Sequence, residues 1–393
     1  MTYQKNALYI GGFRLPNKNA AAQRVIANGK LLKEIGYNVS YIDVDTNYEE
    51  TKGFSENTYD GFKYAIKTQK YPQTKIRWIS YIVNIHFIIN AIENDLGVKP
   101  DIILVYNYPA MALYRLTKYC KSNKIKIVAD ITEWYFPKGG LAFKIIKGLD
   151  SYFRMHHVHK NLDGVIVISK YLERFYNDMN LIRLPPLVDK NSKKWELLNI
   201  KNIRNNSCCQ LIYVGSISHG EKDRLDLVIN SLNRIRDKAR ALRLLVIGVV
   251  KSDYLKFFGE KALPANVDDF VVFLGKRPHE DVIKHIKNSD YSIFLRSKTL
   301  LNTAGFPTKF VESLACGTPV LTNDSSDLSD YMVNGKTGFL LSNSNNETLD
   351  EGLLEALSVG KEKILEMKNR TFKLKNFHYL NYKDELNRFL SKI

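Results

Sequence analysis

The sequence is poor in cysteine, with four in 393 residues. Cys208 and Cys209 are adjacent and make a poor disulfide candidate, because a disulfide requires a specific separation and orientation of its two Cβ atoms. With Cys120 and Cys316 added, the four positions match no metal-ligand spacing. We therefore expect no disulfide framework, and a reducing, cytoplasmic setting fits the composition.

Long apolar runs are also missing. The most apolar stretch, 79–92, is interrupted by Asn84, His86 and Asn90, and it is shorter than the roughly 20 apolar residues that a membrane-spanning helix needs. The chain leads directly into a strand-like segment at 6–12, without the basic, apolar and small-residue regions of a secretion signal. We expect neither a spanning helix nor a leader.

Acidic residues are outnumbered, since 58 Lys and Arg stand against 41 Asp and Glu, for a formal net charge of +17. This excess favours anionic partners: nucleotide diphosphates, an anionic membrane surface or nucleic acid. Solubility alone explains the charge equally well. Because no recognisable nucleic-acid motif accompanies the charge, nucleic acid is not an expected partner.

The sequence is rich in alternating strand and helix signals, which predict α/β architecture with parallel sheets. The expected strands are 6–12, 37–45, 101–107, 125–132, 163–169, 210–216, 242–248, 269–275, 290–296 and 320–324. The clearest helices are 21–36, 170–179 and 224–239.

A polar, lysine- and asparagine-rich stretch at 185–208 interrupts this alternation and has the composition of a linker. It separates two doubly wound units, which we place at 1–190 and 207–376. Open parallel sheets bind ligands beyond the carboxyl ends of their strands. A cleft between the two sheets is therefore the expected site.

The most informative segment is GFPTKFVESLACGTPV at 305–320. Gly305 permits a positive φ and the close approach of a ligand. Pro307 suits the first position of a helix that we expect to end near Ala315. The free amides at 306–309, together with the positive end of the helix dipole, predict an anion site.

Two charged side chains lie on the same face of that helix, Lys309 and Glu312. A cation in the first turn suits a diphosphate, and a carboxylate one turn deeper suits a ribose diol. The alternative is a capped surface helix with a local ion pair between the two.

This segment resembles the donor-binding helix of glycosyltransferase family 4, in which a glycine-rich turn, a glutamate helix and a Gly-x-Pro-Val strand start follow one another. YMVNGKTGFLL at 331–341 resembles the second hallmark of that family. YVGSISHGEKDRLDLVI at 213–229 resembles the strand, loop and helix that bring a basic residue to the donor diphosphate. The segments 245–248 and 271–295 follow in the order of the family.

The resemblance implies a GT-B fold, in which two Rossmann-like domains face each other across a cleft and a final helix at 380–393 crosses back, so that 377–393 joins the N-terminal domain. It also implies a retaining, metal-independent transferase of hexosyltransferase type. The nucleotide sugar, for which we expect UDP, is the substrate, and no cofactor is expected.

The resemblance also assigns site residues. The expected catalytic residues are Lys222, Lys309 and Glu312. The expected donor-binding residues are Gly11, Gly12, Gly215, Arg277, Arg296, Asn302, Thr303, Gly305, Phe306, Pro307 and Thr308.

Two positions depart from the family pattern. The first of the two family glutamates is replaced by Ala304, and the Gly-Arg-Leu of the family is Gly-Ser-Ile at 215–217. Arg296, at a predicted strand end, is a source for the missing positive charge, and Asn302 and Thr303 are candidates to bind the sugar. The departures leave two alternatives open: a GT-B-shaped binding or chaperone subunit without catalysis, and a nucleotide-sugar epimerase.

In the N-terminal half, Gly11 and Gly12 end the first strand, where the resemblance places a glycine loop beside the donor phosphates. A plain turn is the alternative, and the Gly-x-Gly-x-x-Gly pattern of NAD-binding proteins is missing there. Asp130, Glu133 and Trp134 lie around the end of a later strand. We expect them to bind the acceptor, with the indole stacked on a sugar ring; a polar loop with a buried tryptophan is the alternative.

Two further clusters raise the possibility of a metal. Asp43 and Asp45 form an Asp-x-Asp pair of the kind that holds a divalent cation in GT-A transferases, but here the pair ends the second strand. His156, His157 and His159 are expected at the surface or facing a membrane rather than as zinc ligands. We expect no metal.

Segments 70–92 and 137–154 combine basic, aromatic and aliphatic residues. Each fits either a core helix or a helix lying in a membrane interface. We expect the acceptor to be a glycan or a lipid-linked glycan of the bacterial envelope type. The expected location is the cytoplasm, at the inner face of the cell membrane.

Overall fold

The structure is a computed structural model, and it describes residues 4–16, 18–45, 54, 57–68, 83–134, 141–196, 208–217, 222–259 and 262–393. The chain forms two compact units. Unit 1 comprises Met1–Leu187 together with His378–Ile393, and unit 2 comprises Val188–Phe377.

Part of the stretch expected as a linker folds into unit 2. Lys193–Trp195 form a short 3-10 helix, η4, and the Trp195 side chain is 2% exposed. Val188 N donates to Phe377 O at 2.8 Å. The polar composition of this stretch therefore did not predict the burial of Trp195. The rest of the stretch, at 197–207, lies outside the described residues.

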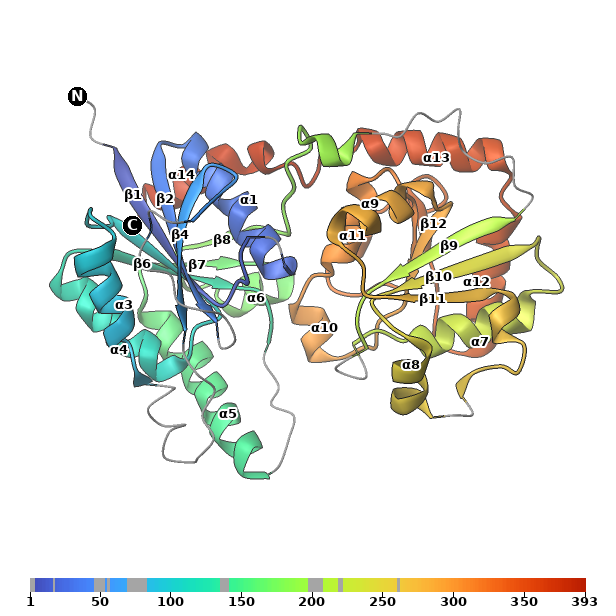
Figure 1. Cartoon of the computed structure of the whole chain (residues 1–393), viewed down its shortest axis with the longest axis horizontal. Helices are drawn as coiled ribbons and strands as arrows, with labels where there is room; N and C mark the ends of the chain where they lie inside the picture. The colour runs from blue at the N-terminus through green and yellow to red at the C-terminus, as the bar shows by residue number, and fades with distance from the viewer. Residues whose placement is uncertain are drawn as a thin grey trace. The chain divides into compact units, whose positions relative to one another are not determined.

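Unit 1 is built on an eight-stranded sheet in the order β3-β4-β2-β1-β5-β6-β7-β8, parallel except for the β3–β4 pair (Figure 1). Its strands are β1 (Lys5–Gly11), β2 (Tyr37–Asp45), β3 (Thr58–Tyr59), β4 (Phe62–Thr68), β5 (Ile102–Tyr106), β6 (Lys126–Ile131), β7 (Gly164–Val167) and β8 (Leu181–Arg183). Its α-helices are α1 (Ala20–Glu34), α3 (His86–Asn90), α4 (Ala110–Ser122), α5 (Leu141–Phe153), α6 (Lys170–Phe175) and α14 (Lys383–Leu390). Short helical turns are η1 (Ala91–Asp95), η2 (Arg154–Val158), η3 (His159–Asn161) and η9 (Tyr379–Tyr382).

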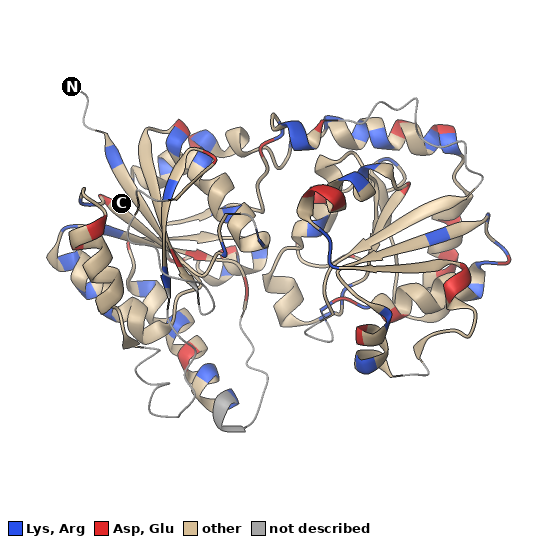
Figure 2. Cartoon of the chain, in the orientation of Figure 1, with Lys and Arg blue, Asp and Glu red and all other residues tan. Residues whose placement is uncertain are grey.

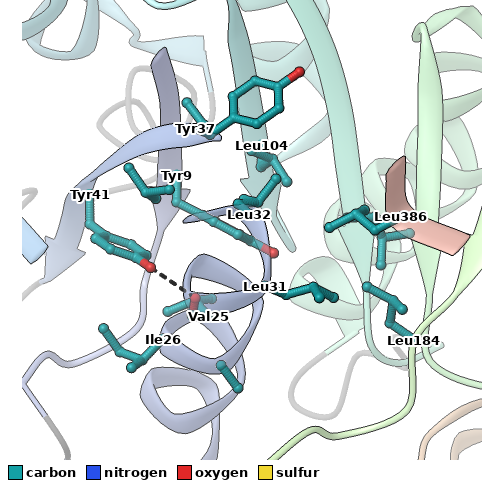
Figure 3. Packing of buried hydrophobic residues seen from close by; sticks show 14 of the residues in the cluster. Tyr9, Val25, Ile26, Leu31, Leu32, Tyr37, Tyr41, Leu104, Leu184 and Leu386 are labelled. Carbon is teal, nitrogen blue, oxygen red and sulfur yellow. Dashed lines mark hydrogen bonds between the residues drawn. The ribbon is translucent and has the colours of Figure 1, made fainter. Parts of the chain in front are cut away.

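Alternation along the strands distributes the core of unit 1 over both faces of the sheet. Tyr9 and Leu104 pack on the face covered by α1 and α14, together with Leu31 and Leu386 of those helices (Figure 3). On the same face the Tyr41 hydroxyl donates to Val25 O at 3.0 Å.

The last helix completes this core. Phe389 of α14 lies so close to β7 that a Cβ added at Gly164 would be 2.8 Å from its ring. Asn180 Nδ2 donates to Phe389 O at 3.5 Å. The C-terminal segment therefore belongs to unit 1, as the resemblance implies.

Unit 2 has a six-stranded parallel sheet in the order β11-β10-β9-β12-β13-β14. Its strands are β9 (Cys209–Val214), β10 (Leu242–Ile247), β11 (Val271–Gly275), β12 (Tyr291–Phe294), β13 (Val320–Thr322) and β14 (Gly338–Leu340). Its α-helices are α7 (Leu225–Ile235), α8 (Lys251–Phe258), α9 (His279–Asn288), α10 (Leu300–Ala304), α11 (Thr308–Ala315), α12 (Asn346–Ser358) and α13 (Lys361–Lys373), with the turns η7 (Val267–Asp269) and η8 (Leu328–Asp330). The predicted α/β architecture of two parallel-sheet units is confirmed. Within the described ranges, no helix combines the length and apolar character that crossing a bilayer requires.

Candidate functional site at the strand ends of unit 2

The strand order of unit 2 reverses between β9 and β12. Beyond the carboxyl ends of two such strands, α/β proteins bind their ligands. Here Gly215 follows β9, and Arg296 follows β12. Asp223 forms an isolated antiparallel bridge with Arg296, and this bridge brings the segment after β9 to the same place.

Lys309 reaches this place from the first turn of α11. Its ammonium forms an ion pair with Asp223 Oδ2, to which the Tyr213 hydroxyl also donates, at 3.0 Å. Lys309 Nζ lies 4.5 Å from the centroid of the Tyr213 ring and 5.4 Å from that of Phe294. The Lys309 side chain is 16% exposed and the Asp223 side chain is 9% exposed, so the pair is not fully closed off from solvent.

Arg296 is a second cation close to Asp223. Arg296 Nε lies 3.8 Å from Asp223 Oδ1. Burial alone would raise the pKa of Asp223, but Lys309 and Arg296 outweigh that effect and hold the pKa below its usual value. Burial lowers the pKa of Arg296 to about 10, against an opposite effect of Asp223. Two cations and one carboxylate leave one net positive charge, which is the sign that a phosphate requires.

The interior of this cluster is not fully hydrogen-bonded. Arg296 and Asn302 are each 1% exposed, yet Arg296 Nε and Asn302 Oδ1 have no hydrogen-bond partner, which is rare for buried polar atoms. Asn302 Nδ2 donates to Lys222 O at 3.0 Å and to Ser297 O at 2.8 Å. The two residues were predicted to contact the donor, but their burial instead makes them supports of Asp223 and of the backbone at Lys222.

Two glycines allow close packing at these strand ends. A Cβ added at Gly215 would lie 2.5 Å from Lys309 Nζ and 2.9 Å from the Tyr213 hydroxyl oxygen. Gly248, at the end of β10, has φ +95°, and a Cβ there would lie within 2.2 Å of Gly215 O. Gly215 therefore makes room for the ammonium of Lys309.

The start of α11 corresponds closely to the sequence prediction. The helix spans Thr308–Ala315 and Pro307 is its N-cap, one position before the one expected. Gly317 beyond the helix has φ +74°. Gly305 permits a positive φ but does not adopt one: it is extended, with φ −90° and ψ 171°, where it caps the end of α10. Thr308 is half-buried at the first helical position.

Two further expected donor contacts are engaged elsewhere. Phe306 is 7% exposed and packs edge-on against Tyr331 and Phe377, with ring centroids 5.7 and 5.9 Å away. The Thr303 hydroxyl donates to Thr299 O at 3.0 Å within its own helix. The Phe306 side chain is therefore part of the core of unit 2.

Glu312 pairs with a residue that the sequence analysis did not select. Its Oε1 lies 3.0 Å from Nε2 of His279, the first residue of α9. The alternative of a local ion pair between Lys309 and Glu312 does not hold: Lys309 pairs with Asp223, and Glu312 pairs with His279. His279 follows the loop 275–278, so Glu312 and the loop with the exposed Arg277 come together in unit 2.

The strand order of unit 1 reverses in the same way, between β1 and β5. Gly11 ends β1, and a Cβ there would lie 2.8 Å from both Cβ and O of Tyr106 at the end of β5. Gly12 is exposed. Asn107 Nδ2 donates to Thr132 Oγ1 at 2.9 Å, so the ends of β5 and β6 are joined by neutral polar groups.

Asp130 is not positioned to bind an acceptor. It is fully buried and pairs with Arg24, with 2.7 Å between its Oδ1 and Arg24 Nη2. The Tyr9 hydroxyl donates to Oδ2 at 2.6 Å and Asn28 Nδ2 at 3.3 Å. Arg24 Nη1 also donates to Leu184 O at 3.0 Å. Asp130 therefore links β6 to α1, and the strand-end position that suggested a binding role places its side chain inward.

Trp134 and Glu133 are half-buried at the end of β6. The Trp134 ring packs edge-on against Phe175, Tyr171 and His156, with centroids 5.0, 5.9 and 6.2 Å away. This agrees with the alternative of a tryptophan packed in a loop, and leaves Glu133 as the carboxylate nearest to solvent in this motif.

Asp43 and His159, from the two clusters considered as metal ligands, form hydrogen bonds within unit 1. Asp43 accepts from the amides of Phe13, Arg14 and Leu15 at 2.8, 3.2 and 2.7 Å. His159 Nδ1 lies 2.8 Å from the Tyr176 hydroxyl. Burial, and to a lesser extent Arg154, lowers the pKa of His159 well below its usual value. Across the described part of the chain, no three His, Cys, Asp or Glu side chains are grouped to hold a metal ion.

Comparison with known proteins finds similarity to glycosyltransferases. Residues 199–374 match the family described as Glycosyl transferases group 1. The chain is also 24% identical over 356 residues to an uncharacterized glycosyltransferase of Methanocaldococcus jannaschii, an alignment that covers 89% of this chain and 86% of the relative.

Solved structures with the same fold extend over the whole chain. The catalytic domain of starch synthase IV from Arabidopsis thaliana, bound to ADP and acarbose, has a TM-score of 0.70 at 13% identity and 99% coverage of both chains. The sucrose-phosphate synthase of Thermosynechococcus elongatus has a TM-score of 0.69 at 13% identity, again with 99% of both chains covered. HepE of Anabaena, in complex with UDP, has a TM-score of 0.64 at 14% identity, covering 99% of this chain and 100% of that one.

The fold and the matched domain define the class of the protein. It is a glycosyltransferase of the GT-B type, with two Rossmann-like parallel-sheet units. The site at the strand ends of unit 2 lies within the glycosyl transferases group 1 domain.

Proposed function

We propose that this glycosyltransferase moves a hexose from a UDP-sugar to a glycan or lipid-linked acceptor in the synthesis of a bacterial cell-surface polysaccharide or glycoconjugate. The motifs that resemble family 4 favour retention of the anomeric configuration. UDP is favoured because HepE of Anabaena, which shares the fold, was solved with UDP and with UDP and glucose.

The observation that carries the proposal is the partly exposed Lys309 side chain at the strand reversal of unit 2. An ammonium has three N–H donors, and Asp223 engages only part of that capacity. The remaining donors, the first-turn amides of α11 and Lys222 supply positive charge to a diphosphate.

This arrangement suits the departure of a nucleoside diphosphate. As the bond between the sugar carbon and the phosphate oxygen breaks, negative charge grows on that oxygen, and groups already fixed near it stabilise the transition state. Lys309, Lys222 and the amides at 308 and 309 have this role in our proposal. Positive side chains thereby do what a divalent cation does in other transferases.

Glu312 is the proposed contact of the ribose diol. His279 holds Glu312 Oε1 at 3.0 Å and so orients the carboxylate. Glu133 of unit 1 remains the proposed acceptor contact, and Arg277 is proposed to line the base.

The direct test is thermal unfolding with UDP-, GDP- and dTDP-sugars. A ligand at about one hundred times its Kd adds about 2.7 kcal/mol to the free energy of unfolding, and we expect this gain from UDP-sugars. Lys309→Met should abolish the gain, whereas Lys363→Met, at an exposed position of α13, should retain it. If no nucleotide raises the melting temperature of the wild type, the donor site is refuted.

Glu312→Gln sharpens the same test. Loss of a ribose contact should weaken UDP more than dTDP, because the deoxyribose of dTDP lacks one of the two hydroxyls. Turnover then separates the reaction classes: a transferase needs an acceptor to release UDP, and an epimerase converts its donor without one.

A further inference from the structure

The surface of unit 1 has an apolar patch that no described residue covers. Large side chains of α5 are exposed at helical spacing and so lie on one side of the helix: Ile145 (53%), Ile146 (44%), Leu149 (63%), Tyr152 (58%) and Phe153 (37%). α5 extends away from the body of unit 1 (Figure 1). Exposed apolar side chains gathered in this way mark an interaction surface.

The neighbouring helix α4 continues the patch. Asp150 of α5 accepts from the Ala110 amide at 2.9 Å, which fixes the start of α4 against α5. Met111 and Tyr114 of α4 are each 40% exposed. We call these seven side chains the α4–α5 patch.

Basic residues outnumber acidic ones on the two helices of the patch. α4 and α5 carry Arg115, Lys118, Lys121, Lys144 and Lys147 against a single acidic residue, Asp150 (Figure 2). Asp150 is engaged with the Ala110 amide. Lys118 Nζ lies 4.6 Å from the centroid of the Tyr114 ring, so cation and apolar surface adjoin.

We propose that the α4–α5 patch binds the surface of a bilayer that carries anionic lipid headgroups. An interfacial helix buries aliphatic and aromatic side chains at the boundary of the acyl chains and holds basic side chains among the headgroups. Tyrosine is enriched at this depth because its ring is amphipathic. A second copy of the chain suits the patch less well, since a two-fold contact would bring equal sets of cations together.

The proposal gives the acceptor of the proposed function a location at the bilayer, but it rests on exposure and charge alone. Donor binding and bilayer binding can therefore fail independently. Loss of nucleotide stabilisation with intact vesicle binding would refute only the donor site.

The test is co-sedimentation of the full chain with vesicles of phosphatidylcholine alone or with phosphatidylglycerol added. We expect binding to the anionic vesicles, weakened by salt, and a loss of about tenfold or more in Ile145→Gln/Leu149→Gln, because two half-exposed aliphatic side chains no longer bury apolar area. Phe257→Gln/Val333→Gln is the matched control: these unit 2 side chains are 41% and 50% exposed, and their removal should leave binding unchanged.

Three results would overturn the proposal. They are no binding of the wild type to anionic vesicles, equal binding to neutral vesicles, and equal binding by Ile145→Gln/Leu149→Gln. A dimer in solution that this variant dissociates, without vesicle binding, would assign the patch to a second copy instead. Circular dichroism and a cooperative melting transition establish that the variant is folded.

Discussion

Units 1 and 2 share a strand order around their reversal points but place their charges differently. In unit 1 the pair Arg24–Asp130 is 3% and 0% exposed. In unit 2 the pair Lys309–Asp223 is 16% and 9% exposed. The same strand order therefore places the Arg24–Asp130 pair in the core of unit 1. It places the Lys309–Asp223 pair at the strand ends of unit 2, where a ligand can compete for the cation. Only the second arrangement is suited to binding chemistry.

We expect the largest effect from a variant that breaks the buried Arg24–Asp130 pair. Arg24→Met leaves Asp130 as a buried charge without a cation and should destabilise unit 1 by about 3–5 kcal/mol. Lys309→Met should cost unit 2 less, about 1–3 kcal/mol, because Asp223 keeps Arg296. Hydrogen exchange of the β1 and β6 amides, compared with those of β9 and β12, reports on each unit separately. If Lys309→Met lowered the stability of unit 2 more than Arg24→Met lowered that of unit 1, the contrast between the two ion pairs would be wrong. The double variant Arg24→Met/Asp130→Asn should recover part of the stability that Arg24→Met loses.

A smaller effect compares the glycines at the two reversal points. In Gly11→Ala the new methyl group meets backbone and Cβ of Tyr106 at 2.8 Å, and overpacking of this kind costs about 1–3 kcal/mol. In Gly215→Ala it meets side-chain ends only, those of Lys309 and Tyr213, so stability should fall less than in Gly11→Ala while stabilisation by UDP-sugar falls. Urea unfolding with and without the nucleotide measures both quantities. Equal losses of stability in the two variants would show that the reversal points are equivalent.

The smallest effect concerns buried lysines of unit 2. Lys368 Nζ donates to Lys287 O at 2.8 Å and Ser289 O at 2.6 Å, at the end of α9. Burial lowers the pKa of Lys368 to about 8, although Asp290 opposes the shift. The unfolded chain then binds more protons than the folded one between pH 8 and the usual lysine pKa near 10.4, so stability rises with pH in that window.

Lys368→Met removes the contribution of this lysine. Between pH 8 and 10 the free energy of unfolding of the wild type should rise by about 1–2 kcal/mol relative to that of the variant. Denaturant unfolding at both pH values measures the difference. Lys361→Met, at an exposed position of α13, is the control and should follow the wild type. A constant difference between wild type and Lys368→Met would show that the lysine is not held in this way.

Sequence periodicity predicted the central strands of both sheets, because parallel strands buried on both faces are continuous apolar runs with sharp ends. The outer strands β3, β4, β8 and β14 were not predicted. The α11 motif could be predicted from local signals: Pro307 and Gly317 delimit the helix, and the spacing of Lys309 and Glu312 puts them on one face.

Long-range partners could not be predicted in this way. Asp223 lies one residue after the selected Lys222, but only the fold shows that it reaches Lys309 and Arg296. His279 lies two residues after the selected Arg277, and this proximity was the available signal. Asp130 illustrates the opposite error. Its place at a strand end is typical of a ligand contact, but alternation directs the side chain toward α1.

The way in which the C-terminal segment completes unit 1 has a consequence for synthesis. Unit 2 consists of one continuous stretch, Val188–Phe377, whereas unit 1 needs His378–Ile393 to close its core around Phe389. Domains form as units during translation, usually the earlier one first. Here the order is reversed: the second unit has all its parts while the first still waits for a helix that the ribosome has not yet made. Until then, the apolar face of the nascent first unit is open to chaperones.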